Sequence, residues 1–318
     1  MRTRSKKGPV GWVRSSFVLA IAILGLAWFE LSLNAQTRRG SPAGGPSVTI
    51  VTEPDAIIWI NEIRRGVTDE TGRLTVNKLP AGRKMLRVRA NGFREVNIPL
   101  ARGRREVNVK LVKSTNAAEL AFQQAETARE QARDDEGRAA AADLYRQALK
   151  LRPAFPAARV GFARVLMDLN EYQAALAEIA AARRTRPAYP EASAVEGRIY
   201  REAAFDEEAI RSFRRAIREG RGFQAEAHVG LARLLEERGR LPEAVAEYRA
   251  ALAQLADSEP VIYQLLGSAY EKMHRPKDAV AAYETYLKLA PDGSLAPAVR
   301  SILDQLKREA EGDIGIIP

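Results

Sequence analysis

The chain has 318 residues, a formal net charge of +10 and no cysteine. This length allows two domains, and the lack of cysteine excludes disulfides, thiolate metal sites, cysteine nucleophiles and lipidation at a cysteine. The net charge is +6 over residues 1–46, +6 over residues 47–112 and −2 over residues 113–318, so the basic character belongs to the N-terminal part.

Residues 1–35 have the pattern of a targeting segment. Basic residues precede an uncharged apolar run of 13 residues, Phe17–Phe29, which is typical of a signal-peptide core and short for a membrane span of about 20 residues. We expect either a signal peptide cleaved before Gln36 or an uncleaved membrane anchor over Ser15–Leu33. Both alternatives predict an exported chain: periplasmic or secreted after cleavage, or anchored in the inner membrane and facing the periplasm.

The pattern then changes twice. Residues 36–46 are rich in Gly, Pro and Ser, which predicts a flexible linker. From residue 47 to residue 112 apolar and polar residues alternate with the period of a half-buried strand. The expected strands are 48–51, 57–60, 74–76, 85–88, 96–98 and 107–111. Turn-forming residues separate these short strands, so the segment predicts a small antiparallel β-sandwich.

Two motifs in this segment suggest a family. The motif Leu79-Pro80-Ala81-Gly82 and the later run Arg87–Phe93 together resemble the PEGA domain. The stretch Thr68–Arg73 is similar instead to the related carboxypeptidase-regulatory-like sandwich. Either resemblance implies a non-catalytic module of bacterial envelope and surface proteins.

Small and large residues recur with a fixed period in the rest of the chain. One small residue returns every 34 or 35 positions, at Ala141, Ala175, Ala209, Ala244 and Ala279. A large residue follows it four positions later, at Tyr145, Ile179, Phe213, Tyr248 and Tyr283. A second small column stands upstream, at Ala163, Gly197, Ala232 and Gly267. Such a period predicts a stacked helix-turn-helix array, because steps of three and four keep residues on one helical face.

This pattern resembles the tetratricopeptide repeat (TPR) family. We expect an all-α TPR solenoid of about five repeats over residues 113–293, with units starting near Phe122, Pro156, Pro190, Ala225 and Pro260. The resemblance implies a concave face, lined by the first helix of each unit, that binds other proteins. Arg159 and Ser193 replace a bulky residue of the family pattern, which predicts looser packing in the second and third units.

Two segments follow the repeats. Residues 294–310 have apolar residues on one side only, which predicts the capping helix that a solenoid needs for solubility. Residues 311–318 form a tail, interpreted either as a frayed end or as a docking peptide.

Arginines recur on the first helices of the predicted repeats. One arginine follows the second small column at a spacing of 34 and 35 residues, and another stands one turn further on. The four candidate partner-binding residues are Arg164, Arg198, Arg201 and Arg233. By resemblance they face the groove, where guanidinium groups suit the carboxylates of an acidic segment or a free C-terminus. In the alternative interpretation, Glu202, Glu236 and Glu237 neutralise them in surface ion pairs worth little.

We find no convincing catalytic, cofactor-binding or metal site in the sequence. Phosphate-binding and nucleophile-elbow motifs are absent. The two histidines, His228 and His274, stand in different repeats, and the acidic run 134–136 is interpreted as a solvated turn. We therefore expect no enzyme activity, no cofactor and no nucleic-acid partner.

These patterns together predict a non-enzymatic exported scaffold or adaptor. It mediates protein–protein interactions in the bacterial cell envelope through the concave TPR surface. The alternative is a cell-wall or surface-attachment module, in which the basic β-sandwich binds anionic polymer and the repeats act as a spacer.

Overall fold

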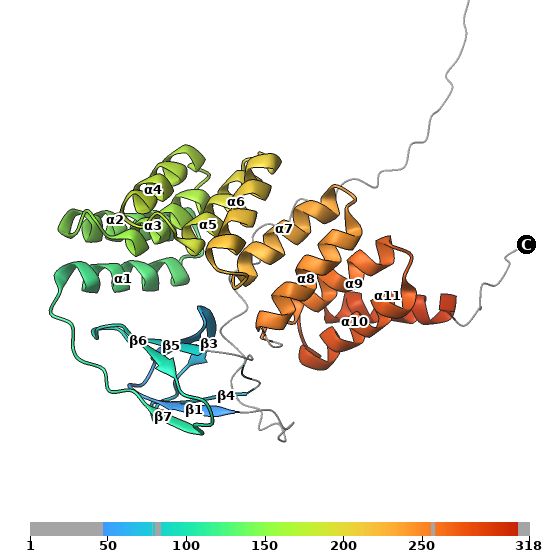
Figure 1. Cartoon of the computed structure of the whole chain (residues 1–318), viewed down its shortest axis with the longest axis horizontal. Coiled ribbons are helices and arrows are strands. Elements are labelled where there is room, and N and C mark those ends of the chain that lie inside the picture. Colours follow the sequence, from blue (N-terminus) through green and yellow to red (C-terminus); the bar gives the residue numbers. More distant parts are fainter. Residues whose placement is uncertain (1–46, 78, 80–83, 256–257, 311–318) are drawn as a thin grey trace, which may run out of the picture. The chain divides into compact units, whose positions relative to one another are not determined.

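The computed structural model describes the chain except for residues 1–46, 78, 80–83, 256–257 and 311–318. The predicted targeting segment, linker and tail lie outside the described residues, as does most of the motif at 79–82. Within the described part, seven strands come first and eleven helices follow (Figure 1). No helix in that part combines the length and the apolar composition needed to cross a membrane.

The strands form two small sheets that pack face to face. The strands are β1 (Val48–Val51), β2 (Ile57–Ile60), β3 (Ile63–Val67), β4 (Arg73–Val76), β5 (Lys84–Arg89), β6 (Val96–Leu100) and β7 (Glu106–Asn108). One sheet has the order β4-β1-β7 and the other β3-β2-β5-β6. Alternate residues of both sheets, such as Ile50 and Ile58, share one buried core. The predicted sandwich is confirmed, and every pair is antiparallel except β1 with β7, which is parallel.

Strand β3 is absent from the sequence prediction. It pairs with β2 through a turn in which Asn61 and Glu62 both have positive φ, 52° and 64°. Positive φ at both central residues defines the type I′ hairpin turn, whose usual signal is Asn-Gly. Here Glu62 replaces the glycine, and the strand itself carries two adjacent arginines. The hairpin therefore lacks the local pattern that would have indicated it.

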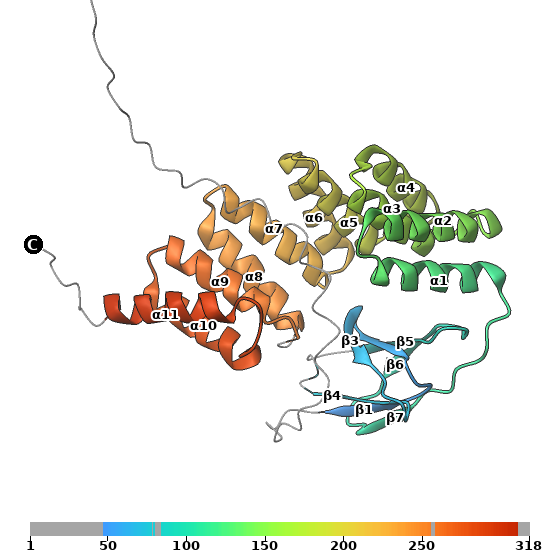
Figure 2. The same cartoon turned by 180° about the vertical axis from the view of Figure 1, so that it is seen from behind.

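The helices stack as five pairs followed by one closing helix (Figure 1, Figure 2). They are α1 (Ala117–Gln131), α2 (Asp135–Leu151), α3 (Pro156–Asp168), α4 (Tyr172–Thr185), α5 (Pro190–Glu202), α6 (Asp206–Glu219), α7 (Ala225–Glu237), α8 (Leu241–Leu255), α9 (Val261–Lys272), α10 (Pro276–Leu289) and α11 (Ala296–Ala310). Helix α1 begins before Phe122 because the Asn116 side chain accepts a hydrogen bond from the Glu119 N–H at 3.1 Å and caps it.

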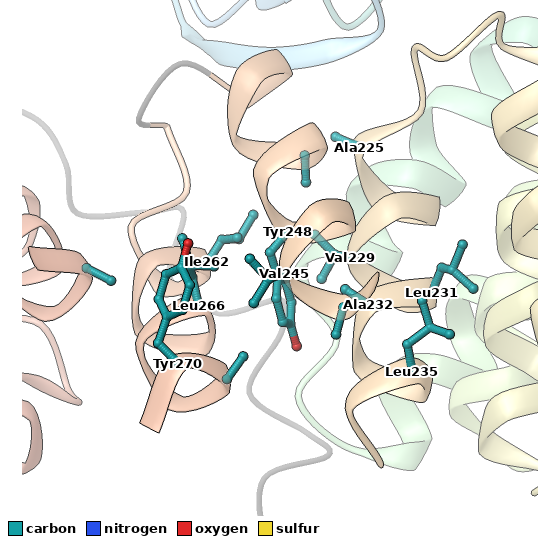
Figure 3. Close-up of a cluster of buried hydrophobic side chains, with 14 of the residues drawn as sticks. Ala225, Val229, Leu231, Ala232, Leu235, Val245, Tyr248, Ile262, Leu266 and Tyr270 are labelled. Atoms are coloured by element: carbon teal, nitrogen blue, oxygen red, sulfur yellow. The ribbon is translucent and has the colours of Figure 1, made fainter. Parts of the chain in front are cut away.

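The two periodic columns form the core of the array. All five alanines of the first column are fully buried, and the large residues four positions later are at most 1% exposed. The fit is close: a Cβ on Gly197 would lie 2.6 Å from the ring of Phe213, so only glycine lets α5 approach α6 this closely. Figure 3 shows the same kind of packing around Tyr248 of α8, with Ala232 of α7 and Leu266 of α9 on either side.

Polar contacts fill the two positions where the family pattern has a bulky residue. Arg159 pairs with Glu178 of α4 at 2.6 Å. Ser193 is fully buried and donates a hydrogen bond to Glu219 of α6 at 2.7 Å. The resemblance alone predicted looser packing at these positions, but the structure places cross-helix hydrogen bonds and an ion pair there.

Hydrogen bonds connect the sandwich to the helices. The buried amide of Gln123 on α1 donates to the Phe93 carbonyl at 2.7 Å and accepts from the Gly92 N–H at 2.8 Å. Elsewhere in the sandwich, the guanidinium of Arg65 on β3 donates a hydrogen bond to the Leu255 carbonyl at the end of α8, at 2.7 Å. Two helices, α1 and α8, are therefore joined to the sandwich by hydrogen bonds.

The turn inside four of the helix pairs has one repeated geometry. A residue in the left-handed region ends the first helix, and the next N–H bonds back to the carbonyl five residues earlier, as in a Schellman motif. The left-handed residues are Asn170, Ala204, Gly239 and His274, with φ of 62°, 60°, 73° and 54°. His274 thus lies in the turn between α9 and α10. Ala204 adopts a conformation that favours glycine.

Exchanging residue types at two of these turns should change stability in opposite directions. Gly239→Ala should lower the free energy of unfolding by about 1 kcal/mol, the approximate cost of a side chain in the left-handed region. No steric clash should add to this cost, because the space for the new Cβ is open. Ala204→Gly should raise it by up to about the same amount. Denaturant unfolding followed by helical circular dichroism measures both. A shift in the same direction for the two variants would contradict this account of the turns.

Candidate partner-binding face

Three successive first helices bring charged groups together. Arg164 of α3 and Arg198 of α5 both reach the carboxylate of Glu226, in the first turn of α7. The Arg164 Nη2 to Glu226 Oε2 distance is 3.3 Å, and the Arg198 Nη1 to Glu226 Oε1 distance is 3.2 Å. Arg164 Nη2 also lies 3.3 Å from Glu191 Oε1 of α5. Two of the four predicted arginines, Arg164 and Arg198, therefore meet at one carboxylate of the next repeat.

The shared carboxylate is held in its charged form. Burial opposes ionisation of Glu226, but Arg164 and Arg198 outweigh it and keep the pKa of Glu226 at about 2. A carboxyl whose pKa falls on folding stabilises the folded state above its ordinary pKa of 4.5, and this contribution is lost as the pH falls toward 2. The two arginines and Glu226 thus form a structural cross-link between repeats at neutral pH.

The other two predicted arginines lie in a different electrostatic setting. Arg201 pairs with Glu202 at 2.6 Å. Burial lowers the pKa of Arg233, and the neighbouring charge of Arg201 lowers it further, against the opposing effects of Glu237 and Glu202. Both arginines therefore have carboxylates as well as a like charge in their surroundings.

The glutamates of the alternative interpretation play unequal roles. Glu202 does pair with Arg201. Glu236, by contrast, accepts a hydrogen bond from the Tyr248 hydroxyl at 2.8 Å and pairs with Lys272 at 2.6 Å. The carboxylates that bind Arg164 and Arg198 are Glu191 and Glu226, which sequence reasoning missed. Their signal was available, because each is the second residue of its helix and they are 35 positions apart.

A second carboxylate bound by two arginines, this one partly buried, lies at the start of the array. Glu126 of α1 is 3.4 Å from Arg129 and 3.5 Å from Arg89 of β5, and it accepts a hydrogen bond from the Tyr145 hydroxyl. Burial opposes its charge, but these arginines prevail and hold the pKa of Glu126 at about 2. The sequence did not indicate this site, because Arg89 comes from the sandwich and meets α1 only in the folded chain.

The remaining polar groups named by the sequence have structural positions. His228 is buried, with Nδ1 2.5 Å from Glu247 Oε2 and Nε2 3.1 Å from the Gly222 carbonyl oxygen. It thus connects α7 to α8 and to the preceding loop. Asp134 caps α2 by accepting a hydrogen bond from the Gly137 N–H at 2.8 Å. Among the described residues, no group of three or more His, Asp and Glu side chains could hold a metal ion.

The arrangement as a whole suits recognition of carboxylates. Arginine presents a planar set of donors that matches a carboxylate, and such charged hydrogen bonds are among the stronger ones in proteins. The face already holds two internal carboxylates in this way, at Glu191 and Glu226. Its chemistry therefore fits an acidic ligand.

The helices resemble those of proteins with known structures. These include a thermophilic TPR protein of Thermus thermophilus at 22% identity and a TM-score of 0.48, over 60% of this chain and 98% of that one. PilF of Pseudomonas aeruginosa matches at 14% identity and a TM-score of 0.53, over 61% of this chain and 86% of that one. At these identities the likeness concerns the fold alone. No curated protein matches the sequence.

Family models identify the repeats directly. Three models of the tetratricopeptide repeat match residues 117–199, 194–260 and 260–292. They span the five helix pairs, and the fold described above agrees with them. Residues 117–292 of this chain therefore belong to the tetratricopeptide repeat family.

Proposed function

We propose that this chain is a non-enzymatic scaffold or adaptor that binds an acidic segment, or a free C-terminus, of a protein partner on the first helices of its repeats. TPR proteins generally mediate protein–protein interactions, and stacked repeats expose the extended surface that such binding needs. The candidate contacts on this face are those of Arg164, Arg198, Arg201 and Arg233.

One observation carries the proposal. Arg164 and Arg198, from different repeats, bind the same carboxylate, that of Glu226. This shared contact supports the proposal, because it is the kind of contact that a partner's carboxylate would make with arginines of neighbouring repeats. Next along the row, the charge of Arg201 lowers the pKa of Arg233, and Arg201 also pairs with Glu202. A partner's carboxylate at this place would add to the attraction that Glu202 already provides.

We further propose that the scaffold works in the bacterial envelope, periplasmic or secreted after cleavage, or anchored in the inner membrane and facing the periplasm. The support is the basic leader with its apolar run in residues 1–35, and the PEGA-like motifs in the sandwich sequence. The strands found over residues 48–108 are compatible with a sandwich module of that kind.

Reversing the charges of Arg201 and Arg233 tests the binding face. Arg201→Glu combined with Arg233→Glu should reduce capture of partners from an envelope extract roughly tenfold or more, since a charge attraction becomes a repulsion. Quantitative mass spectrometry of proteins retained by the immobilised full chain measures the loss. Arg198 is left unchanged, because a glutamate there would face Glu226 and destabilise the array.

The matched control reverses two arginines on second helices, Arg146→Glu with Arg184→Glu. It changes the net charge equally and should retain the captured proteins. Helical circular dichroism verifies that both variants are folded. If the variant with Arg201→Glu and Arg233→Glu, here called the groove variant, captures the same proteins as the unmodified chain, the proposed binding face is wrong.

A second candidate function is attachment to an anionic polymer through the sandwich, with the repeats as a spacer. The observation that favours it is a hollow of about 360 Å³ at one end of the sandwich, lined by Lys84, Arg102, Arg104 and Arg105 among others. Several cations around one hollow raise the local concentration of anions.

Neutralising this hollow separates the two candidates. The full chain with Arg102→Ser, Arg104→Ser and Arg105→Ser should lose cosedimentation with isolated cell walls if the sandwich attaches it, and the binding of the unmodified chain should fade with added salt. The groove variant Arg201→Glu with Arg233→Glu should cosediment as before. Unchanged cosedimentation of the triple variant would exclude attachment through this hollow.

A further inference from the structure

Helix α6 carries a row of arginines that the proposed function does not use. Two of them are adjacent and the others lie three positions to either side, which places all four on one side of the helix. These residues, here called the α6 arginine face, are Arg211, Arg214, Arg215 and Arg218. The helix dipole favours basic residues in the last turn of a helix, which accounts for Arg218 but not for Arg211 and Arg214 in the middle of α6.

The α6 arginine face borders a hollow. The hollow has a volume of about 510 Å³, and its remaining lining comes from Glu208 and Ser212 of α6 and from Glu196 and Tyr200 of α5. It is a different site from the proposed binding face on the first helices. Glu196 and Arg198 are two positions apart on α5, and two residues turn a helix by about 200°, so the hollow and the groove lie on different sides of α5.

Positive charge exceeds negative charge around the hollow. Arg211 pairs with Glu208 at 2.8 Å, and Arg215 pairs with Glu196, which balances two of the four arginines. Arg214 and Arg218 are exposed. Burial lowers the pKa of Arg215, and the charges of Arg183 and Arg218 lower it further although Glu219 opposes them. The geometry and the crowding of cations both favour an anionic ligand.

An apolar surface lies beside the arginines. Tyr200 lines the hollow, and its ring contacts that of Phe205 edge-on with centroids 6.4 Å apart. Phe205 precedes the first residue of α6 and is 53% exposed. An exposed aromatic ring next to a cationic hollow can hold an apolar side chain while the arginines hold carboxylates.

We infer that this hollow is a second binding site, which takes an acidic segment of a protein partner with an apolar side chain next to its carboxylates. Together with the groove on the other side of α5, it would let the array hold two protein segments at once. This inference goes beyond the proposed function, since it concerns a different surface.

The test uses the full chain and a fluorescein-labelled peptide of one phenylalanine followed by glutamates, with binding followed by fluorescence anisotropy. Arg214→Glu with Arg218→Glu should weaken binding roughly tenfold. The groove variant Arg201→Glu with Arg233→Glu makes the same change in net charge and should weaken it much less. Phe205→Ala should weaken binding of this peptide but not of an all-glutamate peptide.

Two outcomes would overturn the inference. Equal weakening by the two double variants would mean that the peptide responds to net charge alone. Weakening by the groove variant only would place the peptide in the groove, which would support the proposed function and reject the α6 site. The failure of one proposal is therefore distinguishable from the failure of the other.

Discussion

The close approach of large rings to small residues is the constraint on which the array depends. Phe213 of α6 lies where a Cβ on Gly197 of α5 or on Gly230 of α7 would collide with its ring. One ring thus fixes the rotation of three helices, two in its own repeat and one in the next. Interiors packed at this density tolerate little rearrangement. This fixed rotation is what brings Arg198 of α5 and Glu226 of α7 to the same side.

The charges on that side stabilise the array. Arg164 and Arg198 have their carboxylate within the protein, at Glu226, and removing one partner of such a pair leaves a poorly solvated charge that costs stability. Arg201 pairs with Glu202, and its charge lowers the pKa of Arg233 on the next first helix. The part of the face where we propose that a partner binds is formed by α5 and α7, which carry these last two arginines.

The sequence predicted those features that depend on periodicity. The alanine column from Ala141 to Ala279 located the core of every helix pair, because burial on one helical face repeats with the repeat itself. Features made by contacts between distant segments could not be found this way. The parallel pairing of β7 with β1 and the contact of Arg89 with Glu126 both join residues with no common local pattern. The hairpin of β3 is local, but its turn lacks the glycine that would have indicated it. The arginines of the candidate site could be predicted because they recur with the repeat. Its carboxylates, Glu191 and Glu226, occur in only two repeats and were missed.

Photo-crosslinking in the living host tests the central claim, that the first helices hold a protein partner, most directly. A photo-reactive residue is placed at position 201 of the full chain, on α5, and in a control at position 146, on α2. The account predicts adducts with another protein from position 201 and none from position 146. Adducts from position 146 alone, or none from position 201 in cells where the chain is abundant, would contradict it.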